Sequence, residues 1–231
     1  MDVFVNQVEC KKILSFSGVC IQCQIMPERY SDKMVANLLP SPLNIDMATW
    51  VSKRKAEYVA GRYLAKQALN YLDARYDIVK TGKNREPIWP QGFVGSISHT
   101  GTTVICAVSS VNDHQRIGLD IERIMAKKTV LELHDIVLVS QEYPLVRRDY
   151  QLDVATFTAI FSAKESLYKA LYPEVKRYFD FLDAMVTQMD LQQGRFSIQL
   201  LQTLTPELKA NLVFKGQVFI NQNHIITSII D

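Results

Sequence analysis

The sequence predicts an α+β fold, because helical and strand patterns come in mixed blocks instead of a regular strand–helix–strand repeat. Two long segments, 50–72 and 155–172, carry apolar residues at three- and four-residue steps. Short segments of alternating apolar residues lie elsewhere, and most of the tail after about residue 179 is of this kind. Of the 231 residues, 48% are apolar and 22% are charged, which is typical of a globular chain that buries a core of its own.

The N-terminal part predicts a strand and a helix. Apolar residues alternate over 19–25, which is typical of a strand. Residues 36–47 are expected to form a loop, since two prolines lie close together there. The periodic segment 50–72 is expected to be a helix, and the turn-rich segment 80–92 a second loop.

The rest of the chain predicts short strands, two helices and a hairpin. Strands are expected at three alternating segments, 94–98, 103–109 and 117–124. Residues 128–143 are expected to be helical, and so are residues 155–172, where Pro173 is expected to end the helix. The tail is expected to end in a hairpin whose strands and turn are 216–220, 224–230 and Asn221-Gln222-Asn223.

Charge and cysteine content bound the class of protein. With 26 Lys and Arg against 24 Asp and Glu, the net charge of +2 argues against a dedicated nucleic-acid binder. The sequence contains no run of 18 apolar residues, so no membrane span is expected. The first residues lack the pattern of a signal peptide. Cys20 and Cys23, the close cysteine pair, would face opposite sides of a strand. We therefore expect a cytoplasmic protein with reduced cysteines and no zinc.

Two carboxylates follow a strand pattern at 117–124. Three apolar residues alternate there with Gly118, Asp120 and Glu122, so both carboxylates leave one face about 6.5–7 Å apart. Like charges at this spacing repel unless a cation lies between them, and carboxylate oxygens favour Mg²⁺ or Mn²⁺. The alternative is an exposed sheet edge with Arg123 as a counter-ion.

A second candidate lies on the predicted helix 155–172. Glu165 and Lys169 are four residues apart and share a helix face. They could form a surface ion pair of small energetic weight. In the functional interpretation, Glu165 is a third metal carboxylate or a base, and Lys169 neutralises phosphate charge.

A third candidate is Ser98-His99, at the end of a short strand and before a glycine turn. A histidine there can donate to an anion, or it can be a solvent-facing loop residue. The fourth candidate is basic. Arg54 and Arg62 lie eight residues apart on the first helix, so they are separated by about 12 Å along its axis. Arginines so placed can hold phosphates bidentately, or they can form the charged face of a surface helix.

Taken in order, these segments resemble the 4′-phosphopantetheinyl transferase superfamily, its surfactin-type branch and, within it, the enterobactin-synthetase component D-like proteins. The resemblance covers residues 53–172, and its order of motifs is specific even though Gly-x-Asp-x-Glu alone is not. The segments that carry it are Arg54-Lys55-Ala56-Glu57-Tyr58-Val59-Ala60-Gly61-Arg62, Arg85-Glu86-Pro87-Ile88-Trp89-Pro90, Gly95-Ser96-Ile97-Ser98-His99, Gly118-Leu119-Asp120-Ile121-Glu122 and Phe161-Ser162-Ala163-Lys164-Glu165-Ser166-Leu167-Tyr168-Lys169-Ala170.

The resemblance implies transfer of 4′-phosphopantetheine from coenzyme A to a serine of an apo acyl or peptidyl carrier protein, with release of adenosine 3′,5′-bisphosphate. It also implies a pseudo-dimer of two similar α+β halves, here 1–115 and 116–231, with the active site in the cleft between them. Coenzyme A is then the co-substrate and Mg²⁺, or Mn²⁺, the metal. A monomer is expected, because one chain already holds both halves.

The resemblance also assigns roles to residues. Asp120, Glu122 and Glu165, with the backbone carbonyl of Ile121, would hold the metal. The catalytic residues would be Glu165 as the base for the carrier serine, Lys169 against charge on the pyrophosphate, and His99. The residues that bind coenzyme A would be Arg54, Arg62, Lys83, Arg85, Glu86, Pro87, Ser98, His99, Asp120 and Lys169.

Two other classes compete with this interpretation. Asp-x-Glu followed by Glu-x-x-x-Lys superficially resembles a Mg²⁺-dependent nuclease, but the near-neutral charge and the Arg-Glu-Pro and Ser-His segments count against it. A non-catalytic paralogue that binds coenzyme A or a carrier would be expected to lack the carboxylates, yet all three are present.

Overall fold

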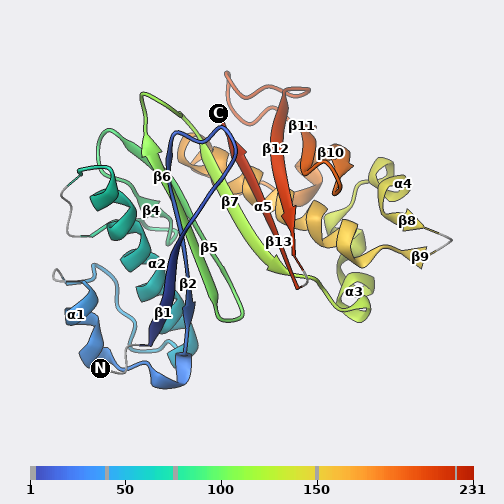
Figure 1. Ribbon diagram of the computed structural model, residues 1–231. Coiled ribbons are helices and arrows are strands. Elements are labelled where there is room, and N and C mark those ends of the chain that lie inside the picture. Colours follow the sequence, from blue (N-terminus) through green and yellow to red (C-terminus); the bar gives the residue numbers. More distant parts are fainter. Residues whose placement is uncertain (1–3, 40–41, 75–77, 149–150, 222) are drawn as a thin grey trace. The chain divides into compact units, whose positions relative to one another are not determined.

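The computed structural model describes residues 4–39, 42–74, 78–148, 151–221 and 223–231 (Figure 1). The chain divides into two compact units, Met1–Ile117 and Gly118–Asp231. Each unit has its own sheet, its own long helix and its own apolar core, so the predicted α+β class with two such halves is confirmed. The predicted cleft between the halves stays a prediction.

Unit 1 is built on a four-stranded antiparallel sheet in the order β1–β2–β6–β5. Its strands are β1 (Val5–Lys11), β2 (Gly18–Ile25), β5 (Phe93–Thr100) and β6 (Thr103–Ser110). The long helix α2 (Ser52–Tyr71) packs on β2 and β6. The smaller elements are η1 (Pro27–Arg29), η2 (Asp32–Met34), α1 (Val35–Leu38), β3 (Lys80–Thr81) and β4 (Pro87–Ile88).

Small residues let α2 approach the sheet closely. Ala56, Ala60, Ala65 and Ala68 are fully buried along the helix, and alanine is also the best helix former. A Cβ on Gly61 would lie 2.9 Å from Cγ2 of Ile97 on β5, so a larger residue would push the helix away. The predicted helix 50–72 is thus confirmed, with ends that differ by one or two residues.

Unit 2 is built on a five-stranded sheet in the order β10–β11–β12–β13–β7. Its strands are β7 (Ile117–Arg123), β10 (Ala184–Asp190), β11 (Arg195–Leu200), β12 (Val213–Ile220) and β13 (His224–Ile230). The long helix α5 (Val154–Val175) packs along this sheet, chiefly on β13 (Figure 1). The smaller elements are α3 (Lys127–Val137), η3 (Ser140–Glu142), α4 (Tyr143–Val146), β8 (Arg147–Arg148), β9 (Gln151–Leu152) and η4 (Phe181–Asp183).

The ends of α5 show why one boundary was predicted wrongly. Asp153 caps the N-terminus by accepting hydrogen bonds from the N–H groups of Ala155 and Thr156 at 3.0 and 3.1 Å. Pro173 does not end the helix, which continues to Val175. A proline removes one donor, but the buried Val175 and the left-handed Lys176, whose N–H donates to the carbonyl of Tyr172 at 2.8 Å, hold the last turn together.

Three other boundaries differ from expectation. The predicted loop 36–47 begins within α1, and its residues 40–41 lie outside the described part of the chain. The predicted loop 80–92 contains the small β3–β4 hairpin, where Thr81 pairs with Pro87. The predicted helix 128–143 ends at Val137, because the chain then turns through η3 to bring Glu142 inside.

The remaining predicted elements are confirmed. The strands at 19–25, 94–98, 103–109 and 117–124 are β2, β5, β6 and β7. The terminal hairpin is formed by β12 and β13, with Gly216 opposite Ile229, while Gln222 of its turn lies outside the described residues. The four cysteines are free thiols. None of the helices described here is long and apolar enough to cross a membrane.

Candidate active site

Strand β7 carries a carboxylate in a buried setting. Asp120 is only 2% exposed, so the interpretation of this carboxylate as part of an exposed sheet edge is wrong. Its neighbour Gly118 explains how α5 comes so near, because a Cβ there would lie 1.8 Å from the carbonyl oxygen of Ser166. Glu122, two residues along the strand, is partly exposed.

Asp120 is held by two side chains of α5. The ammonium of Lys169 lies 2.6 Å from its Oδ1, and the hydroxyl of Ser162 donates to its Oδ2 at 2.7 Å. Charge-assisted hydrogen bonds of this kind are short and strong, and they offset the cost of burying the carboxylate. Lys169 thus places a positive charge on Asp120.

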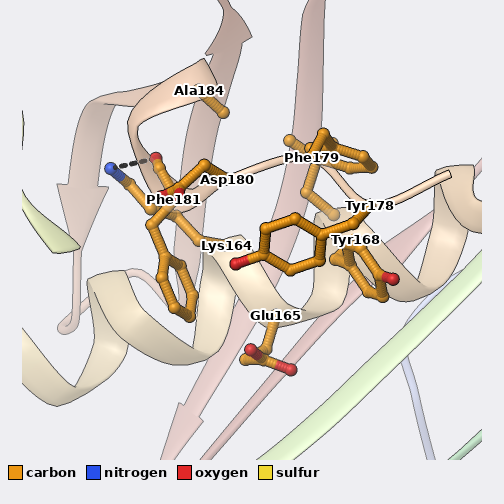
Figure 2. Close-up of a pocket in the computed structure, with 9 residues that line it drawn as sticks. Lys164, Glu165, Tyr168, Tyr178, Phe179, Asp180, Phe181 and Ala184 are labelled. Carbon is orange, nitrogen blue, oxygen red and sulfur yellow. Dashed lines mark hydrogen bonds between the residues drawn. The ribbon is translucent and has the colours of Figure 1, made fainter. Parts of the chain in front are cut away.

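Glu165 lies in the electrostatic field of this pair. Burial raises the pKa of its carboxyl, the ammonium of Lys169 lowers it, and the negative charge of Asp120 raises it. It also lines a cavity of about 160 Å³ within unit 2. Figure 2 shows the adjacent side chains of Lys164 and Glu165 leaving α5 in different directions beside this cavity.

Four of the nine residues that line the cavity are aromatic. Its other lining residues are Lys164, Leu167, Tyr168, Tyr178, Phe179, Asp180, Phe181 and Ala184. The rings of Tyr168 and Phe179 pack with centroids 5.0 Å apart, and that of Tyr178 lies 6.0 Å from Tyr168 (Figure 2). The carboxylate of Glu165 thus lies at the wall of a cavity that aromatic rings line in part.

A buried ion pair supports one wall of this cavity, and sequence reasoning missed its acidic member. The ammonium of Lys164 donates to Oε2 of Glu142 and to the carbonyl of Val137 at 2.7 Å, and to the carbonyl of Phe181 at 3.0 Å (Figure 2). Glu142 also accepts from the N–H groups of Val139 and Val186 at 2.9 and 2.6 Å. The pair thus ties α5 to η3, η4 and β10.

The predicted metal ligands do not form a ready cluster. Within the described ranges, no three His, Cys, Asp or Glu side chains lie together so that they could hold a metal ion. The chemistry of the donors nevertheless fits a hard divalent cation, since Asp120 and Glu122 share a strand and Glu165 is electrostatically coupled to Asp120. The ligand set stays a prediction.

In unit 1, α2 and β5 bring together Arg54 and His99. Arg54 Nη1 lies 2.6 Å from Nε2 of His99, and since a guanidinium only donates, Nε2 must accept. The proton of the neutral ring is then on Nδ1, which lies 3.5 Å from Oε2 of Glu57. Arg54 Nη1 also lies 3.5 Å from that oxygen. Ser98 is buried beside His99, and Glu57 was not among the predicted site residues.

Arg62 is a buried cation, so its assignment to the charged face of a surface helix is wrong. It is 4% exposed, donates from Nη2 to Oγ1 of Thr81 at 3.0 Å, and lies over the ring of Tyr58 at 4.9 Å. Its Nε has no hydrogen-bond partner among the described residues. Burial lowers the pKa of this guanidinium, although an arginine keeps its charge in proteins. A buried cation with an unused donor favours an anionic ligand.

Of the loop residues predicted to bind coenzyme A, Arg85 lies close to another predicted site residue, Arg54, through a shared neighbour, Trp50. The guanidinium groups of Arg54 and Arg85 lie 5.7 and 5.3 Å from the ring centroid of Trp50, a residue that sequence reasoning missed. Glu86 folds back inside its own turn, where Oε2 accepts from the N–H of Asn84 at 2.9 Å. Lys83 is exposed, and Pro87 begins β4. An aromatic ring with arginines beside it is the kind of local signal that could have identified Trp50.

Comparison with known proteins identifies the family. Residues 45–109 match the 4′-phosphopantetheinyl transferase N-terminal domain, and residues 116–227 match the 4′-phosphopantetheinyl transferase superfamily. Enterobactin synthase component D of Salmonella typhimurium is 37% identical over 175 residues, which cover 76% of this chain and 71% of that protein.

Two further relatives agree. Enterobactin synthase component D of Escherichia coli is 38% identical over 141 residues, or 61% of this chain and 65% of that protein. The 4′-phosphopantetheinyl transferase PptT of Mycobacterium tuberculosis is 30% identical over 168 residues, or 69% of each chain. These relatives do not favour a nuclease or a non-catalytic paralogue. The chain therefore belongs to the 4′-phosphopantetheinyl transferase superfamily and is a phosphopantetheinyl transferase.

Proposed function

We propose that this enzyme moves 4′-phosphopantetheine from coenzyme A to a serine hydroxyl of an apo acyl or peptidyl carrier protein. The serine oxygen bonds to the phosphorus that bears pantetheine, and the bond from this phosphorus to the bridging pyrophosphate oxygen breaks. Adenosine 3′,5′-bisphosphate leaves, and the serine proton goes to Glu165. The observation that carries the proposal is the position of Glu165, on an apolar cavity and beside the Asp120–Lys169 pair.

The acidic residues and Lys169 would act on the pyrophosphate. Asp120, Glu122 and Glu165, with the carbonyl of Ile121, would hold one Mg²⁺ or Mn²⁺ ion. Such an ion would neutralise charge on the pyrophosphate and on the leaving group. Lys169, whose side chain is a quarter exposed, would turn its ammonium from Asp120 toward phosphate oxygens. Positioning and electrostatics would supply most of the rate, as in other phosphoryl transfers.

The basic residues of unit 1 would hold the nucleotide end of coenzyme A. Arg62 is the strongest support, because its charge is buried and its Nε has no acceptor within the described part of the chain. Arg54 and His99 would join it at the phosphates, with Ser98 beside them. The turn that contains Lys83, Arg85, Glu86 and Pro87 would close over the adenosine part.

The aromatic cavity would receive the pantetheine arm. The arm is a flexible chain with few charges, so an apolar lining suits it better than a basic one. Because Glu165 lines the same cavity, the arm would leave its phosphate close to the base. The nucleotide and the arm would thus be bound by different sets of side chains.

The names of two relatives support a proposal about the carrier and the pathway. Their name, enterobactin synthase component D, supports a peptidyl carrier domain of siderophore or other nonribosomal peptide synthesis as the acceptor. We further propose that the enzyme acts in the cytoplasm as a monomer, and that neither a nucleic acid nor a membrane is its partner.

Intact mass spectrometry tests this function directly. The purified chain is incubated with coenzyme A, Mg²⁺ and an apo peptidyl carrier domain, and the carrier should gain the mass of one phosphopantetheine. A carrier whose acceptor serine is replaced by alanine should gain nothing, and a chelator should stop the reaction. An unmodified carrier, under conditions in which a known transferase modifies it, would contradict the proposal.

A further inference from the structure

Three buried hydroxyl groups form a continuous hydrogen-bonded chain that ends on Asp120. Ser162 and Ser166 belong to α5 and Thr227 to β13, and none of the three is exposed. The oxygens Ser166 Oγ and Thr227 Oγ1 lie 2.7 Å apart, Thr227 Oγ1 and Ser162 Oγ 2.9 Å apart, and Ser162 Oγ and Asp120 Oδ2 2.7 Å apart. The chain therefore connects the three elements that meet around Asp120.

Counting protons fixes the direction of this chain. A carboxylate only accepts, so the single hydroxyl proton of Ser162 goes to Asp120. Thr227 must then donate its proton to Ser162. Ser166 has one proton left for two acceptors on Thr227, the hydroxyl oxygen at 2.7 Å and the backbone carbonyl at 3.0 Å. The hydroxyl protons of Thr227 and Ser162 thus both point toward Asp120, and hydrogen bonds aligned in this way strengthen one another.

The chain leaves the two oxygens of Asp120 in different situations. Oδ2 is engaged from the protein interior by Ser162, while Oδ1 carries the ammonium of Lys169, a side chain that is a quarter exposed. The carboxylate therefore cannot rotate without breaking a buried hydrogen bond. A hydroxyl left unpaired inside the protein costs free energy, so the buried hydrogen bonds hold the carboxylate of Asp120 in this orientation.

We propose that Ser162 and Thr227 are positioning residues that fix the carboxylate of Asp120 so that Oδ1 is the oxygen offered to a cation. This inference rests on the proposed function, in which Asp120 is a metal ligand. Removal of a group that orients a metal ligand in this way typically lowers the affinity for the metal by about 10- to 100-fold. The same residues would matter little for binding the carrier.

The test compares matched variants of the full chain. Ser162→Ala and Thr227→Val each remove one hydroxyl group from the hydrogen-bonded chain, whereas Thr227→Ser keeps the hydroxyl group. Ser228→Ala is the control, because Ser228 is the next residue on β13, is equally buried, and has no partner for its hydroxyl among the described residues. Mn²⁺ binding is followed without carrier, by the loss of the free-ion electron paramagnetic resonance signal.

The expected result is Mn²⁺ binding about 10- to 100-fold weaker in Ser162→Ala and Thr227→Val, and close to wild type in Thr227→Ser and Ser228→Ala. In transfer assays, the Mg²⁺ concentration for half-maximal rate should rise by a similar factor, with little change in KM for the carrier. If Ser162→Ala does not fold, the comparison of Thr227→Val with Thr227→Ser tests the inference by itself.

Two results would overturn the inference. One is wild-type Mn²⁺ binding by folded Ser162→Ala or Thr227→Val, and the other is an equal loss in Ser228→Ala, which would indicate general loosening. Failure of the proposed function is distinguishable, because the wild-type chain would then bind no Mn²⁺ or would leave the carrier unmodified in the presence of Mg²⁺.

Discussion

The ammonium of Lys169 lies 2.6 Å from Oδ1 of Asp120, so a lysine of α5 neutralises a buried carboxylate of β7. Removing one member of such a pair leaves the other without its partner, at a cost of about 1–3 kcal/mol for a buried acceptor. The pair also places the ammonium on the oxygen that we propose for a divalent ion, and this overlap leads to the first prediction.

Lys169→Met should lower the free energy of unfolding by about 1–3 kcal/mol without Mg²⁺. Added Mg²⁺ should restore part of this loss, because an ion that binds the folded state stabilises it by mass action. Thermal unfolding at several Mg²⁺ concentrations measures the effect. An increase in Tm with Mg²⁺ that is no larger than in the wild type would show that Asp120 does not accept the ion in place of Lys169.

Glu165→Gln should lower kcat by about 10²- to 10⁴-fold, because an amide cannot take the proton of the carrier serine. Binding of coenzyme A should change much less, since the residues that we propose for the nucleotide are others. Steady-state kinetics and calorimetric titration with coenzyme A measure the two quantities. An equal loss of turnover and of affinity would make Glu165 a binding ligand and not the base.

Arg62→Met should weaken binding of coenzyme A by about 10- to 100-fold, the range expected when a charged hydrogen bond of about 1.5–3 kcal/mol is lost. The same variant should unfold at the wild-type temperature or higher, because it removes a buried charge whose Nε is unpaired among the residues that the structure describes. Calorimetry with coenzyme A and thermal unfolding test the two halves of this prediction. Unchanged affinity in a stable variant would exclude Arg62 from the nucleotide site.

Glu142→Gln should lower the free energy of unfolding by about 3–5 kcal/mol, since it leaves the buried ammonium of Lys164 without a counter-ion. Glu132→Gln is the control, because its pair with Lys128 is exposed and 3.9 Å long, and such pairs contribute little. Urea unfolding of both variants gives the comparison. Similar stabilities would mean that the buried pair is dispensable for the fold.

Thiol reactivity should single out Cys10. Burial raises the pKa of Cys20 and of Cys23 to about 12, and it raises the pKa of Cys106 well above its usual value. At pH 8 these thiols are therefore protonated and unreactive, and their thiolate fraction would rise about tenfold with each pH unit. A disulfide reagent at pH 8 should titrate one fast thiol in the native chain and four after denaturation. More than one fast thiol would contradict the burial.

Local periodicity was enough to predict most elements of the fold. The helices α2 and α5 and the strands β5, β6 and β7 were predicted to within a few residues, because the face of each that is buried repeats with the period of its own backbone. The end of α5 was misplaced, since the local effect of Pro173 was outweighed by packing of the turn that follows it. Which residues carry the chemistry stays a prediction from the order of motifs, and Asp120, Glu165, Lys169, Arg54 and His99 are the residues that it names.

Only the tertiary structure decided how those residues are held. Asp120 depends on Ser162 and, through it, on Thr227, which are 42 and 107 residues away in the chain. Arg62 and Glu142 have no local pattern that marks them as buried charges. The physical reason is that periodicity tells which residues share a face, whereas the identity of the element that covers this face, and hence the burial and the partners of a polar side chain, is set by contacts between distant parts of the chain.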